Sequence, residues 1–281
     1  EINVGDWNII SRDNLEPTFR RYIHMEPQTR PLKKGTGDPE LILDLLNIEN
    51  NSDEALLLLV YIASCFIPNI SHPIPIILGP QGAAKSTMYR LIQSIVDPSK
   101  TELLSLPNRN DELIQKLSHS WLAFFDNVSK IPRITSDTLC RASTGGSHSK
   151  RKLYTNADDY ILKFRNCVGI NSIGLKSIQP DLLDRALMIE LSRVSDENRM
   201  TEREIIKEFE ENKALIFTGF LDIITKAMKL KQNVEVDKLP RMADFYKWGI
   251  AITMALGFEK ERFIKAYKNN GKVQCNTAIS F

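Results

Sequence analysis

The octapeptide GPQGAAKS, residues 79–86, constrains this chain more than any other stretch. It follows a short apolar run with β-branched residues, 74–78, as expected for a strand buried on both faces. It precedes a stretch, 87–96, in which apolar residues recur at helical spacing. In a strand–loop–helix unit of this kind, backbone N–H groups and the helix dipole converge on phosphate. The pattern therefore predicts a phosphate-binding loop.

This loop is expected to supply the nucleotide contacts. Lys85 would reach the β- and γ-phosphates of ATP, and the Ser86 hydroxyl would ligate Mg²⁺. Ala84 stands where the usual pattern has glycine, and we expect it to need only an ordinary backbone conformation and to leave the site open. The alternative is a glycine- and proline-rich turn with a solvated lysine. The nucleotide-binding residues predicted here are Gly79, Pro80, Gln81, Gly82, Ala83, Ala84, Lys85, Ser86 and Thr87.

A second apolar strand, in WLAFFDN (121–127), ends in an aspartate. At that position Asp126 would hold Mg²⁺ through its water shell beside the phosphate loop, or it would only cap the strand end. The next residue, Asn127, stands where most hydrolytic ATPases have a glutamate. An amide orients water but accepts no proton, so either hydrolysis is slow or another carboxylate is the base. Asp137 is the nearest in sequence, although its position is more typical of a helix N-terminus.

A third apolar strand, in NCVGINSIG (166–174), also ends in a polar residue. Asn171 is predicted to reach between the two earlier strands and to hold the γ-phosphate or the attacking water. An asparagine at a strand end is also common in turns. The prediction for Asn171 therefore depends on the order of the three strands along the chain, in which its strand comes last.

The pattern along the chain predicts three parts. Residues 1–37 are expected to be a lead-in or linker, 38–194 an α/β core with a parallel sheet, and 195–281 a helical lid. Helices are expected near 39–46, 53–67, 110–117 and 136–142 in the core, and at 196–211, 213–230, 240–256 and 258–269 in the lid. The chain has no start methionine, and we expect a fragment of a longer polypeptide.

Composition narrows the class of protein. A net charge of +2 excludes a globally basic nucleic-acid binder but permits a local basic patch. The four cysteines lie far apart and suit reduced thiols of a cytoplasmic protein, and the four histidines form no cluster for zinc. No apolar run is long enough to cross a membrane.

The order of these motifs, followed by QPDLLDRALMIEL (179–191), resembles that of the AAA+ ATPases. More narrowly it is similar to the helicase modules of mobile-element and viral primase-helicases, in the neighbourhood of superfamily 3. The alanine before the lysine of the loop also resembles the minichromosome-maintenance helicases. The resemblance implies an AAA+ P-loop αβα core with an all-helical lid, with ATP and Mg²⁺ as cofactors.

Carried over to this chain, the resemblance implies further roles. Asn171 would be the first sensor, and Arg185 an arginine finger that reaches the ATP of a neighbouring subunit. The alternative for Arg185 is a surface salt bridge to Asp181 or Asp184. Arg241 resembles a second sensor that swings from the lid onto the γ-phosphate, or else it is a solvated residue at a helix start.

The segment STGGSHSKRKLYTNADDYILKF (143–164) is similar to one that precedes the sensor strand in viral primase-helicases. It is predicted to form a hairpin that contacts the DNA backbone. Its candidate nucleic-acid-binding residues are Lys150, Arg151 and Lys152, with His148 behind them. Asp158 and Asp159 at the expected tip would repel phosphate, so a solvated face or an intersubunit role stays an alternative.

Together these observations predict an ATP-dependent DNA helicase or translocase module of a mobile-element or viral replication protein. We expect a homo-oligomeric ring, six subunits by analogy, that acts on single-stranded or forked DNA near the nucleoid and works with a primase or polymerase domain. The first alternative is an ATP-driven assembly switch that binds DNA without unwinding it. The second is a P-loop small-molecule kinase.

Overall fold

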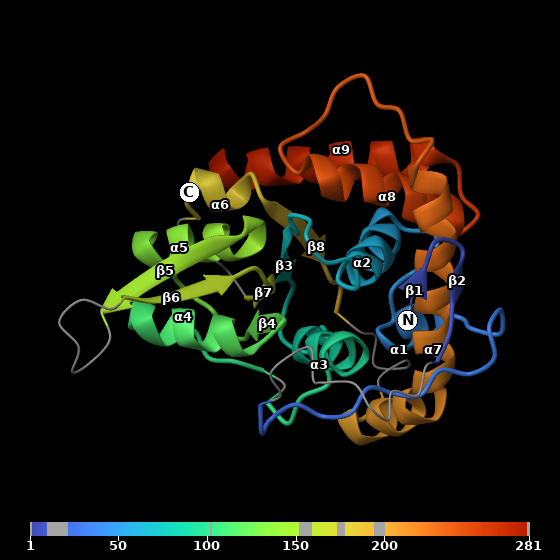
Figure 1. Cartoon of the computed structure of the whole chain (residues 1–281), viewed down its shortest axis with the longest axis horizontal. Helices are drawn as coiled ribbons and strands as arrows, with labels where there is room; N and C mark the ends of the chain where they lie inside the picture. The colour runs from blue at the N-terminus through green and yellow to red at the C-terminus, as the bar shows by residue number, and fades with distance from the viewer. Residues whose placement is uncertain are drawn as a thin grey trace.

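The computed structural model describes residues 2–9, 22–101, 103–151, 159–172, 178–193 and 200–279. Its centre is a sheet of four parallel strands in the order β4–β7–β3–β8 (Figure 1). The strands are β3 (Ile74–Leu78), β4 (Leu122–Phe125), β7 (Cys167–Asn171) and β8 (Ala186–Glu190). Leu104 extends the sheet beyond β4, since its N–H donates to Phe124 O at 2.9 Å and its carbonyl accepts from Asp126 N at 2.9 Å. The sheet confirms the predicted α/β fold.

Both faces of the sheet are buried, because strand side chains alternate between two hydrophobic clusters. In β4, Leu122 and Phe124 join one cluster, while Ala123 and Phe125 join the other. One face is covered by α4 (Asn110–His119), α5 (Arg133–Thr144) and the short α6 (Pro180–Leu183). The larger cluster on the other face includes α1 (Leu41–Leu45), α2 (Asp53–Ser64), α3 (Lys85–Val96), α7 (Glu202–Lys231), α8 (Ala243–Ala255) and α9 (Lys260–Ile279). This double burial explains why the strands are apolar throughout.

The helical end of the chain differs from the expectation in one respect. The two helices expected at 196–211 and 213–230 are one helix, α7, of 30 residues within the described chain. Nothing between them breaks a helix, and Asn212 Nδ2 donates to Glu208 O at 3.0 Å, one turn back. A capping box at Thr201 and Glu204 fixes its start. Across the described ranges, no helix combines the length and the apolar character that a membrane span requires.

The expected hairpin lies between α5 and β7. Strands β5 (Gly146–Arg151) and β6 (Asp159–Phe164) pair antiparallel, with Ser147 opposite Lys163 and Arg151 opposite Asp159. The hairpin projects from the sheet and its two strands are prominent at the left of Figure 1. Its tip lies outside the described residues.

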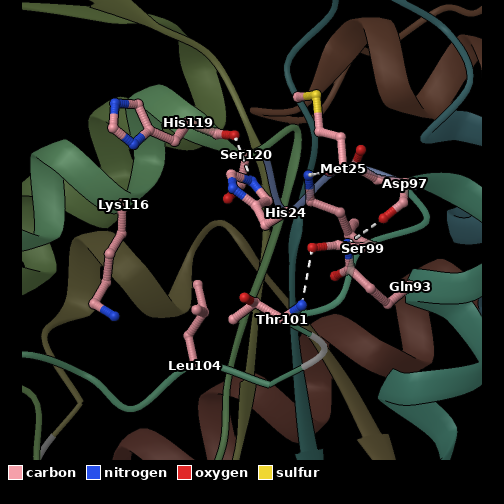
Figure 2. Close-up of a pocket in the computed structure, with 11 residues that line it drawn as sticks. His24, Met25, Gln93, Asp97, Ser99, Thr101, Leu104, Lys116, His119 and Ser120 are labelled. Atoms are coloured by element: carbon pink, nitrogen blue, oxygen red, sulfur yellow. Dashed lines mark hydrogen bonds between the residues drawn. The ribbon is translucent and has the colours of Figure 1, made fainter. Parts of the chain in front are cut away.

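The segment before α1 is packed against the rest of the chain. Met25 pairs with Ser99, and Gln28 Nε2 donates to Ile95 O at 2.9 Å, which ties the segment to the end of α3. Further on, Leu32 N donates to Thr218 Oγ1 of α7 at 2.8 Å. Under its first part lies a small cavity of 170 Å³, lined by His24, His119, Asp97 and neighbouring residues (Figure 2). The segment therefore connects α3 to α7.

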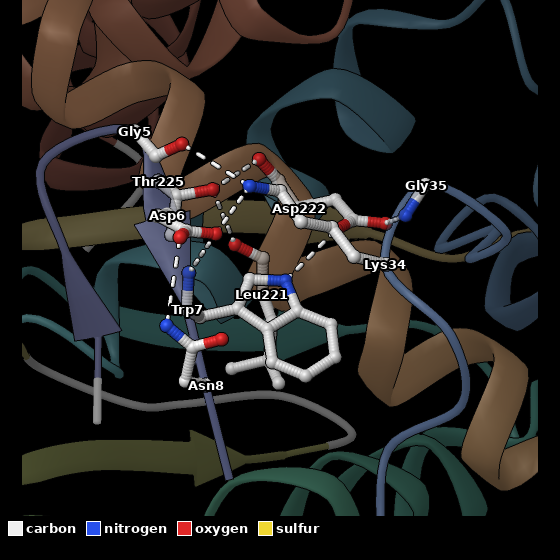
Figure 3. Close-up of polar contacts among 9 residues, drawn as sticks. All are labelled: Gly5, Asp6, Trp7, Asn8, Lys34, Gly35, Leu221, Asp222 and Thr225. Atoms are coloured by element: carbon white, nitrogen blue, oxygen red, sulfur yellow. Dashed lines mark hydrogen bonds and ion pairs between the residues drawn. The ribbon is translucent and has the colours of Figure 1, made fainter.

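Residues 2–9 dock on α7 as a small hairpin of β1 (Ile2–Asn3) and β2 (Asp6–Trp7), with Trp7 buried. Asp222 of α7 accepts two hydrogen bonds there, from Trp7 Nε1 at 2.8 Å and from Gly35 N at 2.9 Å (Figure 3). Lys34 forms an ion pair with Asp6 beside them. One carboxylate thus fastens two distant parts of the N-terminal segment to the same helix.

Candidate functional site

The candidate phosphate loop, residues 79–84, joins the end of β3 to the start of α3, as predicted. Leu191 follows β8, and a Cβ on Gly79 would lie 2.6 Å from its carbonyl oxygen. Only glycine therefore allows the loop backbone to lie this close to Leu191. Gly82 has a φ of +79°, which also favours glycine. The turn that leads into α3 is therefore tight.

Ala84 corrects the sequence-based expectation. The residue has φ +54° and ψ +21°, in the left-handed region, where we expected an ordinary conformation. It precedes Lys85, the first residue of α3, and its carbonyl accepts the helical hydrogen bond of Met88 N at 2.9 Å. The chain must reverse its direction here to enter the helix, which explains why the common pattern has glycine. An alanine in this conformation costs about 1–2 kcal/mol.

Lys85 lies at the inner end of the loop. Its Nζ donates to Gly79 O at 2.7 Å and to Pro80 O at 2.8 Å, and the residue is 8% exposed. Burial lowers the pKa of Lys85, an effect that the nearby Asp126 carboxylate opposes. Within the described residues no carboxylate forms an ion pair with it. The ammonium is held by carbonyl dipoles alone, an arrangement that suits an incoming phosphate.

Three further side chains meet beside the loop. Ser86 Oγ donates to Asp126 at 3.0 Å from Oδ2, and Asn171 Nδ2 donates to Ser86 Oγ at 3.2 Å and also to Asp126 Oδ1. The three side chains meet because β7 lies between β3 and β4 in the sheet. This places Asn171, at the end of β7, between the two earlier strands, as predicted. A hydroxyl and a carboxylate side by side are hard oxygen ligands, and Mg²⁺ typically takes one or two such groups plus water and phosphate oxygens. The residues present therefore fit Mg²⁺.

Asn127 follows in a left-handed conformation, with φ +53°, and its N–H donates to Asp126 Oδ1 at 2.9 Å. Its side chain is exposed at the cleft. Asp137, the carboxylate nearest in sequence, lies on the exposed side of α5 and is not among the residues that line the cleft. Of the described carboxylates, those that line it are Asp126 and Glu202.

These groups surround one open cleft of 510 Å³ at the carboxyl ends of the strands. Arg90 of α3 and Glu202 of α7 contact each other at its rim and form an ion pair. The described residues that line it are Gln81, Gly82, Ala83, Ala84, Lys85, Ser86, Thr87, Arg90, Asp126, Asn127, Asn171 and Glu202. The first residue of α7 thus lines this cleft.

A second pocket of 240 Å³ adjoins the cleft and shares Gly82, Ala84, Thr87 and Glu202 with it. Its wall is mostly apolar and comes from the end of α1 and the start of α7, with Leu45, Leu46, Met200 and Ile205. Polar groups of Asp44 and Asn47 complete it. We did not predict these residues, because α1 lies far before the loop in sequence and carries no motif. A small apolar pocket beside a phosphate cleft suits a planar base.

The two candidate arginines lie elsewhere. Arg185 precedes β8 and its carbonyl accepts from Ile74 N at 2.8 Å, so it lies at the amino end of the sheet, about 16 Å from the phosphate loop at roughly 3.3 Å per strand residue. Its guanidinium forms an ion pair with Asp181 at 2.6 Å, which was the alternative interpretation, and is 14% exposed. Hydrogen bonding to Arg185 is the main cause that lowers the pKa of Asp181 to about 2.

Arg241 is not brought to the cleft either. It forms ion pairs with Asp181 and, at 3.0 Å, with Asp184, so it lies with Arg185 at the amino end of the sheet. These carboxylates, which precede β8, hold it away from Lys85 of its own chain. The structure therefore gathers Lys85, Ser86, Asp126, Asn127 and Asn171 into one site, and Arg185 and Arg241 into another.

The candidate DNA-binding residues fall on the hairpin. Positions 148, 150 and 151 belong to β5, where His148 pairs with Leu162 and Lys150 with Tyr160. Lys152 lies outside the described residues. The hairpin starts from the amino ends of β4 and β7, away from the cleft.

Comparison with known proteins gives a family. A protein-family model described as "Actinomycete integrative conjugative element replication protein" matches residues 40–270. Among curated proteins, none matches this chain.

Solved structures are also similar to the chain. An MCM homologue from Methanopyrus kandleri has a TM-score of 0.52 at 12% identity, over 85% of this chain and 59% of that one. The A form apo structure of the NrS-1 C-terminal region has a TM-score of 0.45 at 18% identity, over 71% of this chain and 48% of its own length. Another A form apo structure of that region has a TM-score of 0.45 at 14% identity, over 86% and 71%. This chain thus spans about half of the first NrS-1 structure, and the MCM homologue supports the fold alone.

Proposed function

The chain belongs to the actinomycete integrative conjugative element replication proteins, and from this premise we propose that it is an ATP-dependent motor that moves along or unwinds DNA. The observation that carries the proposal is the meeting of Lys85, Ser86, Asp126 and Asn171 in one cleft at the carboxyl edge of the sheet. Crevices at this edge are the usual ligand sites of parallel α/β sheets.

In the proposed site, the triphosphate lies along the loop and the N-terminus of α3. The Lys85 ammonium then donates to phosphate oxygens in place of its two carbonyl partners. Anionic phosphate oxygens accept hydrogen bonds from a cation more strongly than carbonyl oxygens do. The base enters the adjoining pocket between α1 and α7. Ser86 and Asp126 would hold Mg²⁺, which would neutralise charge on the β- and γ-phosphates.

Hydrolysis requires an oriented water and an outlet for its proton. Asn171 and Asn127 have amides at the cleft that would orient the water. Asp126 already accepts from Ser86, Asn171 and the Asn127 N–H, and Glu202 pairs with Arg90, so neither carboxylate is a free base in this conformation. We therefore expect a slow basal rate that rises when subunits assemble.

We propose that Arg185 acts in the ATP site of the neighbouring subunit. It lies too far from its own phosphate loop to act there, so any role in hydrolysis would be at the site of an adjacent copy. An arginine supplied in trans stabilises the charge of the transferring phosphoryl group. Asp181 holds the guanidinium in place, and Arg241 shares that carboxylate, so Arg241 would position Arg185.

On this proposal the chain acts as a homo-oligomeric ring, six subunits by analogy. Hairpins β5–β6 would contact single-stranded or forked DNA through Lys150, Arg151, Lys152 and His148. A primase or polymerase domain, in the same polypeptide or in a partner, would use the strand that is exposed.

The decisive experiment measures ATP hydrolysis across protein concentration, with and without single-stranded DNA. We expect the rate per subunit to rise with protein concentration and with DNA, and Lys85→Ala to remove it. A rate per subunit that is independent of both variables would contradict the proposal.

One observation favours a second function. Asn127 supplies an amide where a base is usual. Slow hydrolysis of this kind suits an ATP-driven assembly switch that binds DNA but does not unwind it. A forked DNA substrate distinguishes the two, because a switch would bind the fork in ATP and leave it paired.

A further inference from the structure

A second open groove lies at the base of the hairpin. It has a volume of 590 Å³ and includes Trp121, which precedes β4, and Arg165, which precedes β7. It therefore lies at the amino edge of the sheet, whereas the phosphate cleft lies at the carboxyl edge. Its described lining is Pro68, Asn69, Trp121, Gly145, Gly146, Ser147, Lys163, Phe164 and Arg165.

The charge of this groove has one sign. Lys163 is exposed and Arg165 is half-buried, and the described lining contains no carboxylate. Neither cation forms an ion pair with any residue that the structure describes. Arg185 and Arg241, by contrast, are both paired with aspartate. Two cations in one concave surface, neither paired within the described part of the chain, favour an anionic ligand.

The floor of the groove holds Arg165 in place. A Cβ on Gly145 would lie 2.9 Å from both Nε and Nη2 of Arg165, so the guanidinium rests directly on the glycine backbone. Gly145 has a φ of +98°, which also favours glycine. The turn between α5 and β5 thus leaves the space that this cation occupies.

The groove also has a fixed aromatic wall. Trp121 Nε1 donates to Cys65 O at 2.7 Å, and the ring packs edge-on against buried His72 at 5.6 Å. These contacts fix the orientation of the half-exposed indole. Rigid aromatic faces beside cations are how proteins hold single strands without regard to sequence.

Lys163 faces the groove from the outer side of the hairpin. Phe164 and Leu162 on either side of it pack into the core, so Lys163 lies on the opposite side of β6. Ser147 of β5 is opposite Lys163 and also lines the groove. The groove thus includes the start of β5 and the end of β6.

We propose that this groove binds the phosphodiester backbone of single-stranded nucleic acid, with Lys163 and Arg165 on phosphates and Trp121 against a base or sugar. The proposal deepens the proposed function, on which it rests, by giving the strand a path at the foot of the hairpin. Contacts to phosphates carry no sequence information, so we expect binding to be independent of sequence.

The test compares two double variants that each remove two positive charges. Lys163→Ala with Arg165→Ala changes the groove, and Lys238→Ala with Lys260→Ala, at exposed positions elsewhere, is the matched control. Binding of a fluorescent oligothymidylate is measured by anisotropy, without nucleotide, over a range of salt concentrations. Two lost phosphate contacts should reduce the salt slope by about 1.4 and weaken binding about 25-fold at 0.1 M salt, whereas the control should match the wild type.

Other outcomes would overturn the inference. One is a groove variant with the wild-type slope. Another is a variant that binds the oligonucleotide normally but assembles less well, which would assign the groove to a neighbouring subunit. Thermal unfolding and DNA-free ATPase rates confirm that the variant is folded. The DNA-free ATPase rates depend on Lys85 and not on the groove residues. A result that refutes the groove proposal is therefore distinguishable from one that refutes the proposed ATP-dependent motor.

Discussion

Replacing Ala84 with glycine tests the least expected feature of the phosphate loop. Ala84 has a left-handed backbone at the start of α3, where glycine is the residue without steric penalty. Ala83, its neighbour, is 2% exposed and has a negative φ. The same substitution at the two adjacent positions should therefore have opposite effects.

The magnitudes follow from the two environments. Ala84→Gly relieves about 1–2 kcal/mol of left-handed strain and loses about 0.4–1 kcal/mol through the greater entropy of the unfolded chain. The net effect is a stabilisation of about 0.5–1 kcal/mol. Ala83→Gly loses the burial of a methyl group, about 0.8 kcal/mol, with the same entropic loss. It should destabilise by about 1.5 kcal/mol, so the two variants should differ by about 2 kcal/mol.

Urea unfolding, followed by circular dichroism, measures this difference, provided that the m-value is the same in both variants. Nucleotide affinity of Ala84→Gly should equal that of the wild type, since the backbone path is unchanged. If Ala84→Gly destabilises the chain as much as Ala83→Gly, the left-handed conformation is wrong and the loop has another shape.

Three further predictions follow. Lys85→Ala should weaken ATP binding by about one to two orders of magnitude, through loss of a charged hydrogen bond; unchanged affinity in calorimetry would refute the loop assignment. Arg185→Ala should bind ATP normally but hydrolyse it about 10³-fold more slowly or worse, and mixing it with Lys85→Ala should restore part of the rate; no restoration would argue against a shared site. Burial lowers the pKa of His72 to about 4, so its unfolded form binds more protons between pH 6.5 and 4 and stability falls as pH falls. Relative to His72→Gln, the wild type should lose about 2 kcal/mol of unfolding free energy between pH 7 and pH 5, and equal losses would contradict neutral burial.

The strands and the loop between β3 and α3 were predictable because their signals are local. A buried strand is apolar throughout, and Asp126 and Asn171 each follow such a strand, so parallel pairing brings both to the same edge. The sheet order then places Asn171 between the other two strands. Within this loop the expected conformation of Ala84 was wrong, because alanine by itself favours ordinary backbone regions.

The rest depends on contacts between residues far apart in sequence. Trp7 and Asp222 are separated by 215 positions, and nothing in the polar N-terminal stretch signals that it packs on α7. The pocket beside the cleft joins α1 to α7 in the same way. We did not predict a role for Lys163 and Arg165 because they are two ordinary cations in sequence. Only the fold shows that they share a groove in which no described residue forms an ion pair with them.

The loop that we propose to bind phosphate and the arginine that we assign to a neighbouring subunit lie at opposite edges of one sheet. Contact between copies would then join unlike surfaces, head to tail. In an open arc of subunits, the ATP pocket at one end would lack an arginine from a neighbour. The arginine at the other end would contact no ATP pocket. Closing the circle would complete that last pocket, so turnover per subunit would itself report whether the assembly is closed.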